Sequence, residues 1–306
     1  MTMTPGSAAA HDADRPDLTG RTIGFIGLGL MGKPMVRHLA ARGARPVIHS
    51  RSRGPVEELA GEGMTPADTP AAVAAAADTV VLMLTDTPAV EAVTEGPGGL
   101  LEGLRPGALV IDMGTTAVAA TRRLAEVVAG RGGALVDAPV SGGTVAAEAA
   151  TLTIMAGGEE AAVRRAWPLF AAMGRRITHV GGPGAGQVAK AANQVIVALS
   201  IGAVAEALAL ARAAGVDPAR VREAIRGGFA ESRILELHGE RMVTGNYTPG
   251  GRSSVQLKDL NQALALAAES GIDLPAVTLS RTLYERLVDR GDGGLDHAAL
   301  YRLFTG

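Results

Sequence analysis

The chain of 306 residues contains no cysteine, few aromatic residues and no large excess of either charge. The absence of cysteine excludes disulfides, thiolate metal sites and a cysteine nucleophile, and it fits a reducing compartment. We therefore expect a cytoplasmic protein. A net charge of -2 at pH 7 gives no electrostatic basis for binding nucleic acid or an acidic membrane surface.

Long apolar runs are also missing. No uninterrupted run reaches about 18 residues, the length that indicates a membrane-spanning helix. The nearest stretch, Val188–Ala214, is interrupted by charged and polar residues, so we expect no membrane insertion. Residues 1–19 are small and polar, lack the apolar core of a secretory signal, and are expected to form a flexible tail.

Histidines with metal-ligand spacing are absent as well. Asp296 and His297 are adjacent, but we interpret them as part of a helix cap. We therefore predict no metal site. The six histidines are His11, His38, His49, His179, His238 and His297.

A glycine-spaced loop is the most informative feature that is present. Residues 24–35 lie between a strand-like run, Thr22–Ile26, and a helix-like run, Lys33–Ala41. This pattern binds a dinucleotide pyrophosphate, because its glycines allow a tight turn, a close approach of backbone to phosphate, and close helix packing. The helix N-terminus adds N–H donors and a positive dipole end. The predicted cofactor-binding residues here are Gly27, Leu28, Gly29, Leu30 and Met31.

The second predicted strand, Pro46–His49, is followed by Ser50, Arg51 and Ser52. An acidic residue about twenty positions past the loop normally accepts hydrogen bonds from the ribose of NAD. No acidic residue stands here, and Arg51 with two serines suits a 2′-phosphate. We therefore predict a preference for NADP(H), with NAD(H) possible.

Strand-like runs alternate with alanine-rich helical stretches up to about residue 180, which predicts an α/β fold with a doubly wound, parallel Rossmann-type sheet. We expect this dinucleotide-binding domain to span residues 20–183. The expected strands are Thr22–Ile26, Pro46–His49, Thr79–Leu84, Leu109–Asp112, Leu135–Asp137, Thr151–Met155 and Ile177–Val180.

An all-α domain is expected over residues 184–306. It begins with a long helix ending near Gly215, which at about 1.5 Å per residue is long enough to join two domains. Because this helix is apolar on nearly every side, we expect a partner subunit to bury it in a homodimer or homotetramer. Further helices are expected at Pro218–Ile225, Ser253–Ser270, Ala276–Arg290 and Asp296–Phe304, with Asp217, Ser253 and Asp296 as caps.

Three groups of residues are candidates for the chemistry. Lys190, Asn193 and Gln194 share one face of the long helix. A desolvated lysine is a better acid near neutral pH, so Lys190 is a candidate proton donor to a carbonyl oxygen. The turns Ser141–Gly142–Gly143 and Gly114–Thr115–Thr116 follow predicted strands, where ligands of such sheets bind.

These residues resemble the β-hydroxyacid dehydrogenase family, which includes 3-hydroxyisobutyrate dehydrogenases, and most closely its tartronate semialdehyde reductase branch. The resemblance runs from about residue 21 to 304. It is carried by residues 24–35, Asp137–Gly143 with Thr151–Met155, Gly182–Gln194 and Lys258–Leu260. Likeness to the branch lies in residues 190–199, 224–230 and 294–300.

The resemblance implies NAD(P)H-dependent reduction of a short aldehyde acid to a 3-hydroxy acid, or the reverse. It implies Lys190 as the general acid and Thr115 and Lys258 near the cofactor, together with Leu84 after its strand. The implied substrate-binding residues are Ser141, Gly142, Gly143, Asn193 and Gln194.

The chain departs from the family pattern at several positions. Gly114 replaces a common serine, Thr85 replaces a frequent proline, and Gly251 stands where a large apolar residue is common. Ala146 and Ala150 replace glycines and would be strained wherever the backbone needs positive φ. Two other functions stay open: an imine reductase, which typically lacks this lysine, and a non-enzymatic NADP(H)-binding regulator.

Overall fold

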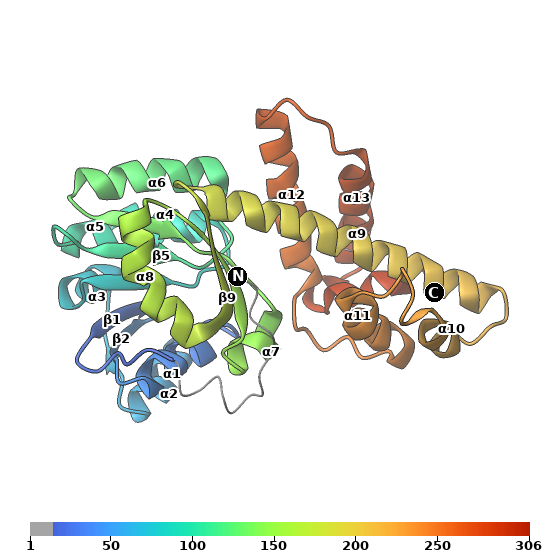
Figure 1. The fold of residues 1–306 in the computed structure, drawn as a ribbon, viewed down its shortest axis with the longest axis horizontal. Helices are drawn as coiled ribbons and strands as arrows, with labels where there is room; N and C mark the ends of the chain where they lie inside the picture. The colour runs from blue at the N-terminus through green and yellow to red at the C-terminus, as the bar shows by residue number, and fades with distance from the viewer. Residues whose placement is uncertain (1–14) are drawn as a thin grey trace. The chain divides into compact units, whose positions relative to one another are not determined.

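The computed structural model describes residues 15–306, and the chain divides into two compact units, Met1–Lys190 and Ala191–Gly306. The division falls inside the long helix rather than at the predicted boundary between residues 183 and 184. The first unit is the α/β domain, and the second is entirely helical (Figure 1).

A nine-stranded sheet forms the centre of the first unit, with strand order β3-β2-β1-β4-β5-β6-β8-β7 and β9 paired to β8. The strands from β3 to β6 are parallel, as the alternating pattern predicts, and β8 adds an antiparallel edge because it runs antiparallel to β6 and β7. The strands are β1 (Thr22–Ile26), β2 (Arg45–His49), β3 (Thr65–Pro66), β4 (Thr79–Leu82), β5 (Leu109–Asp112), β6 (Ala134–Asp137), β7 (Val140–Ser141), β8 (Leu152–Gly157) and β9 (Gly174–Gly181).

Helices cover both faces of this sheet, as the alternating pattern predicts (Figure 1). Each face has its own apolar core, one built around Phe25 and Phe170 and the other around Val80 and Val110. The first core includes α1 (Gly32–Ala41), α2 (Arg53–Gly61), α7 (Gly143–Glu148) and α8 (Glu160–Met173). The second includes α3 (Pro70–Ala76), α4 (Thr87–Glu95), α5 (Leu100–Gly103) and α6 (Val118–Gly130).

The helix α9 (Ala185–Ala213) begins in the first unit and continues into the second. The second unit packs around the fully buried Tyr284 and the inner face of α9. Its other elements are α10 (Pro218–Ile225), α11 (Arg233–Thr244), α12 (Ser253–Glu269), α13 (Pro275–Asp289), the 3₁₀ turns η1 (Asp292–Gly294) and η2 (His297–Tyr301), and α14 (Arg302–Thr305).

Several expectations need correction. Residues 15–19 do not belong to a flexible tail, because Leu18 is fully buried and Arg15 donates to the carbonyl oxygen of Ala150 at 2.8 Å; residues 1–14 lie outside the described part. The strand expected to reach Leu84 ends at Leu82. Ser253 is not a cap, because its hydroxyl donates to the Leu295 and Asp296 carbonyls instead.

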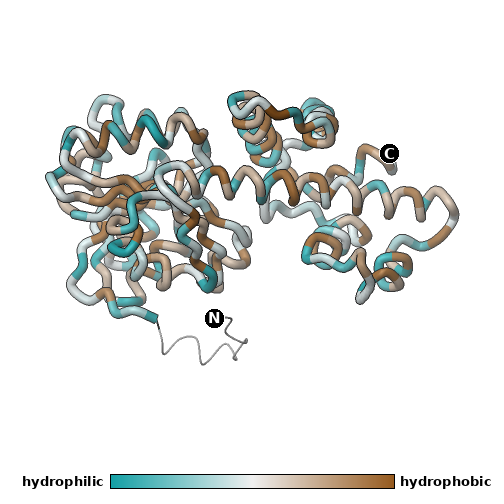
Figure 2. The backbone as a smooth tube through the Cα atoms, turned by 45° about the horizontal axis from the view of Figure 1, so that its top comes forward, coloured by the Kyte–Doolittle hydropathy of each residue, from teal (hydrophilic) through white to brown (hydrophobic). Residues whose placement is uncertain are grey.

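The helix α9 is long and apolar enough to cross a membrane by length and composition, with a mean hydropathy of 2.0 in its most apolar window. Its tube stays mainly white to brown along its length (Figure 2). A core helix of a water-soluble protein passes the same test, so this single helix is weak evidence for a membrane span. Lys190 and Glu206 within it argue against one.

Candidate active site

The glycine loop has the geometry that its sequence predicts. Gly27 adopts a φ of 101°, and a Cβ there would lie 2.3 Å from the Met83 carbonyl oxygen. A Cβ on Gly32 would lie 1.9 Å from the Gly27 carbonyl oxygen, so only glycine lets α1 approach the loop this closely. A Cβ on Gly29 would meet nothing within 4 Å, which leaves open space beside the backbone where a phosphate is expected.

The neighbouring predicted cofactor residues differ in exposure. Leu28 is buried beneath the loop, whereas Leu30 is 58% exposed. Met31 directly precedes α1. A methyl carbon of Leu84 is among the atoms closest to a Cβ built on Gly27, at 3.1 Å. Since β4 pairs with β1 on the side opposite β2, Leu84 lies at the point where the strand order reverses, the usual ligand crevice of such sheets.

Ser50, Arg51 and Ser52 follow β2 at the same edge of the sheet. The Gly27 N–H donates to the His49 carbonyl oxygen at 3.0 Å, which ties the glycine loop to the end of β2. Arg51 and Ser52 are exposed, and Ser52 precedes α2 without capping it through its side chain. This arrangement leaves Arg51 exposed, two residues beyond the point where the glycine loop is tied to β2.

The turn after β5 is held by Gln187 from the first part of α9. The Gln187 side chain accepts from the Thr116 N–H at 3.2 Å and donates to the Gly114 carbonyl oxygen at 3.0 Å. Asp112 accepts from the Gly114 N–H at 2.9 Å and from the Thr116 hydroxyl at 2.5 Å. Thr115 therefore lies on a turn fixed from two sides. A Cβ on Gly114 would lie 2.6 Å from the Leu84 carbonyl oxygen, so the family's serine does not fit this backbone.

Asp137, at the end of β6, holds the start of α9. Its carboxylate accepts from the Gly184 N–H at 2.8 Å and from the Gln187 N–H at 2.9 Å. Burial raises the pKa of the Asp137 carboxyl, and these N–H donors oppose the rise. The contact fixes the helix that carries Lys190 to the carboxyl edge of the sheet.

Lys190 is buried, and its Nζ donates to the Val140 carbonyl oxygen at 2.9 Å. Val140 and Ser141 form β7, and the chain then turns through Gly142 and Gly143 with φ values of 130° and 63°. The structure therefore brings the ammonium next to the strand that leads into the predicted carboxylate-binding turn. A charged group that is buried in this way requires such a polar partner.

In the second unit, the side chains of Asn193 and Gln194 are hydrogen-bonded to each other. Asn193 Nδ2 donates to Gln194 Oε1 at 2.8 Å, and Gln194 Nε2 donates to Asp259 Oδ2 at 2.5 Å. Lys258 forms an ion pair with Asp259 Oδ1 at 3.0 Å. The role of Lys258 near the cofactor stays a prediction.

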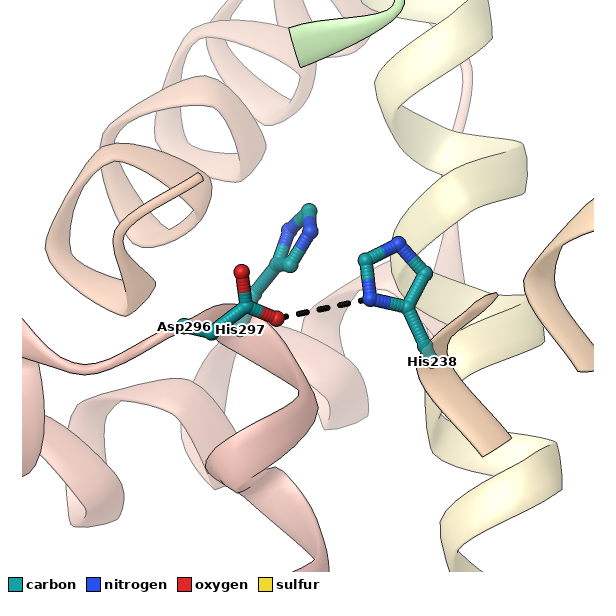
Figure 3. A group of neighbouring side chains, drawn as sticks. All are labelled: His238, Asp296 and His297. Atoms are coloured by element: carbon teal, nitrogen blue, oxygen red, sulfur yellow. Dashed lines mark ion pairs between the residues drawn. The ribbon is translucent and has the colours of Figure 1, made fainter. Parts of the chain in front are cut away.

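A second cluster in this unit joins His238 on α11 to Asp296 and His297 (Figure 3). The imidazole rings of His238 and His297 meet edge to face at 4.5 Å. The buried Asp296 carboxylate accepts from the N–H groups of Gly250 at 2.9 Å and Ala298 at 3.1 Å, and it pairs with Arg241 at 3.3 Å. It thus caps η2 as predicted and also fastens the preceding loop.

These contacts favour a structural role for the cluster over a metal site, since an arginine already pairs with the carboxylate that would have to be a ligand. Burial alone would raise the pKa of the Asp296 carboxyl, but His238, His297 and the N–H groups hold that pKa far below its ordinary value. The sequence did not predict the meeting of His238 with His297, because they belong to separate elements.

The two alanine departures have different consequences. Ala146 lies inside α7 and is unstrained. Ala150 has a φ of 51° and is the one non-glycine residue with positive φ in residues 15–306. At Gly251, a Cβ would lie 3.3 Å from the His297 ring, so a large side chain there would displace the imidazole.

Sequence reasoning did not predict four polar residues that hold the site together: Asp112, Asp137, Gln187 and Gln256. Only their positions at strand ends or on helices could have indicated them.

Comparisons with known proteins find similar proteins over nearly the whole chain. Residues 22–181 match the NAD binding domain of 6-phosphogluconate dehydrogenase, and residues 184–304 match the model described as NAD-binding of NADP-dependent 3-hydroxyisobutyrate dehydrogenase. A curated relative, 2-hydroxy-3-oxopropionate reductase of Escherichia coli (strain K12), is 45% identical over 91% of this chain and 95% of its own length.

Two solved structures share the fold. A 3-hydroxyisobutyrate dehydrogenase of Mycobacterium tuberculosis, solved with L-serine, has a TM-score of 0.86 and 29% identity over 94% of this chain and 99% of the other. An imine reductase from a Pseudomonas species has a TM-score of 0.58 and 19% identity over 92% of this chain and 98% of the other, which indicates a common fold alone.

Proposed function

Because this chain belongs to the β-hydroxyacid dehydrogenase family, we propose that it transfers a hydride between NADP(H) and a short aldehyde acid or 3-hydroxy acid. The observation that carries this proposal is the buried ammonium of Lys190, held 2.9 Å from the Val140 carbonyl oxygen. A hydride that reaches a carbonyl carbon leaves an oxygen that needs a proton, and an ammonium at this edge of the sheet supplies it.

The remaining predicted residues are assigned to the substrate and to the cofactor. The turn of Ser141, Gly142 and Gly143 is assigned to the substrate carboxylate. Asn193 is kept as a predicted substrate-binding residue. The pyrophosphate lies on the glycine loop, where Gly29 leaves open space beside the backbone. Thr115 contacts the nicotinamide ribose from the turn fixed by Gln187.

The preference for NADP(H) is supported by the exposed Arg51 and by the absence of an acidic residue at the end of β2. An Arg guanidinium binds a phosphate through charge-assisted hydrogen bonds, whereas NAD(H) offers only a ribose hydroxyl at that position. The same segment provides Ser50 and Ser52 as smaller donors. Use of NAD(H) at lower efficiency is compatible with this arrangement.

A homodimer or homotetramer is also proposed. Ile196 and Leu210, both on α9, are 66% and 72% exposed in the single chain. Exposed large apolar side chains on a helix of this length are typical of a subunit interface. A stable monomer in sedimentation velocity at micromolar concentration would contradict this part of the proposal. We propose a cytoplasmic location, in keeping with a cysteine-free chain.

A substrate panel tests the reaction. The purified enzyme is assayed with NADPH and NADH against short aldehyde acids, and in the reverse direction against hydroxy acids, with cyclic imines as a third class. Oxidation of NADPH that depends on an aldehyde acid supports the proposal. Turnover of imines alone indicates an imine reductase, and tight NADPH binding without any turnover indicates a regulator; either result overturns the proposal.

A further inference from the structure

The buried polar contacts of the second unit form a chain of hydrogen bonds that ends at Asn193. Gln194 lies between Asn193 on one side and Asp259 and Gln256 of α12 on the other. Gln194, Gln256 and Asp259 are each no more than 9% exposed, and Asn193 is only partly buried. The bonds therefore lead from the interior of the helical unit to a side chain that a ligand can reach.

The direction of each bond is fixed by chemistry. A carboxylate only accepts hydrogen bonds, so the amide nitrogen of Gln194 must face Asp259, at the observed 2.5 Å. The Gln194 oxygen then faces Asn193 and accepts from its Nδ2 at 2.8 Å. Lys258 pairs with the other oxygen of Asp259 at 3.0 Å, which stabilises the negative charge at the inner end.

Gln256 reinforces the same orientation. Its Oε1 accepts from Gln194 Nε2 at 3.3 Å, and its own Nε2 donates to the Gln194 backbone carbonyl oxygen at 3.3 Å. Gln194 is thus held at both its side chain and its backbone. Turning its amide over would place its oxygen against the Asp259 carboxylate and leave buried donors and acceptors mismatched, which is costly.

We propose that Gln194 is a positioning residue: fixed by Asp259, it sets the orientation of the Asn193 amide and so determines which atoms Asn193 presents to the substrate. With one Nδ2 hydrogen bonded to Gln194, Asn193 offers its Oδ1 as an acceptor and its second N–H as a donor. This inference rests on the proposed function, and it replaces the expectation that Gln194 itself binds substrate.

The inference is tested by reversing the direction of the hydrogen bond between residues 194 and 259. Gln194→Glu puts two carboxylates in contact, and Asp259→Asn allows the Gln194 amide to turn over. In the double variant, Asn at 259 donates to Glu at 194, whose other oxygen still accepts from Asn193. At pH 9, where a glutamate side chain is ionised, we expect each single variant to lower kcat/KM for the aldehyde acid about 10- to 100-fold, the effect of a small misplacement. The double variant should recover part of this loss, because Gln256 Oε1 still faces the side chain at position 194.

Further measurements separate a positioning role of Gln194 from a general loss of stability or of cofactor binding. Asn261→Asp adds a negative charge on the exposed face of α12 and is expected to leave kcat/KM near wild type. In Gln194→Glu the KM for NADPH is expected to stay unchanged, while Asp259→Asn is monitored for a cofactor effect through Lys258. The urea midpoints of all variants are recorded, and they should fall in the single variants and recover in part in the double variant.

Each outcome decides the question. A double variant whose stability recovers while kcat/KM does not would overturn the inference, because Gln194 would then contact the substrate directly. An unchanged kcat/KM in Gln194→Glu would also overturn it. If the wild-type enzyme reduces no aldehyde acid, the proposed function fails; the urea midpoints then still test the bond order, and a double variant no more stable than the single variants refutes the inference separately.

Discussion

The Nζ atom of Lys190 donates a hydrogen bond to the backbone carbonyl oxygen of Val140 at 2.9 Å. Val140 begins β7, so this bond holds the ammonium beside the strand that leads into the Ser141–Gly142–Gly143 turn. Asp137 holds the start of the same helix through the N–H groups of Gly184 and Gln187. The tip of the lysine and the start of the helix that carries it are thereby both held in place, which is the pre-organisation that general acid catalysis needs.

Replacing Lys190 with alanine is expected to lower turnover by about 10²–10⁴-fold, the usual contribution of a general acid. Cofactor affinity should stay near wild type, because the glycine loop follows a different strand. Steady-state kinetics and a fluorescence titration with NADPH measure the two quantities. Lys190→Arg keeps the charge and a donor for Val140 but does not release a proton near neutral pH, so it should be equally impaired. Most of the activity remaining in either variant would contradict the assigned role.

The second prediction concerns Arg51 and the preference for NADP(H). Arg51→Asp removes the guanidinium and adds a charge that repels a 2′-phosphate, so the ratio of kcat/KM for NADPH to that for NADH should fall about 10- to 100-fold. Arg53→Asp is the matched control, since Arg53 is also exposed but is directed to Asp68 at 3.6 Å. An unchanged ratio in the Arg51 variant, or an equal fall in both, would remove the argument for NADP(H).

The parts of the fold that depend on local sequence could be predicted. The glycine loop, the alternation of strands and helices, and the long helix all follow from spacing within a few residues, and the structure confirms them. The helix α8 carries Pro168 in its interior, where proline removes a backbone donor and normally ends a helix. Here the surrounding apolar core stabilises the helix in spite of it.

The parts of the site that depend on distant contacts could not be predicted. Gln187 bonds to Gly114 across 73 residues, and Gln194 bonds to Asp259 across 65. Nothing in the spacing of these residues marks them as partners, because their meeting depends on how the elements pack. The strand at β8 was predicted, but its antiparallel direction was not, since strand direction is a property of the assembled sheet.

Asp296→Asn tests the electrostatics of the second unit. The folded state lowers the pKa of this carboxyl, so its charge stabilises the protein above the pKa of the unfolded chain, and that stabilisation is lost as pH falls toward the lower folded pKa. At pH 7 the variant should lose about 3–5 kcal/mol of unfolding free energy, the usual cost of breaking a buried pair. Urea unfolding from pH 7 to pH 3 should show the difference from wild type shrinking below about pH 4. A difference independent of pH would indicate that packing alone is responsible.

Two alanines follow the Ser141–Gly142–Gly143 turn, and replacing each with glycine should change the unfolding free energy differently. At Ala150, with its φ of 51°, glycine relieves about 1–2 kcal/mol of left-handed strain, and this offsets the loss of a buried methyl group worth about 0.8 kcal/mol. Ala150→Gly should therefore leave the unfolding free energy unchanged or slightly raised. At Ala146, inside α7, glycine should cost about 1 kcal/mol because it weakens the helix. Urea denaturation of the two variants side by side measures the contrast. Equal losses at both positions would mean that the backbone at Ala150 is relaxed.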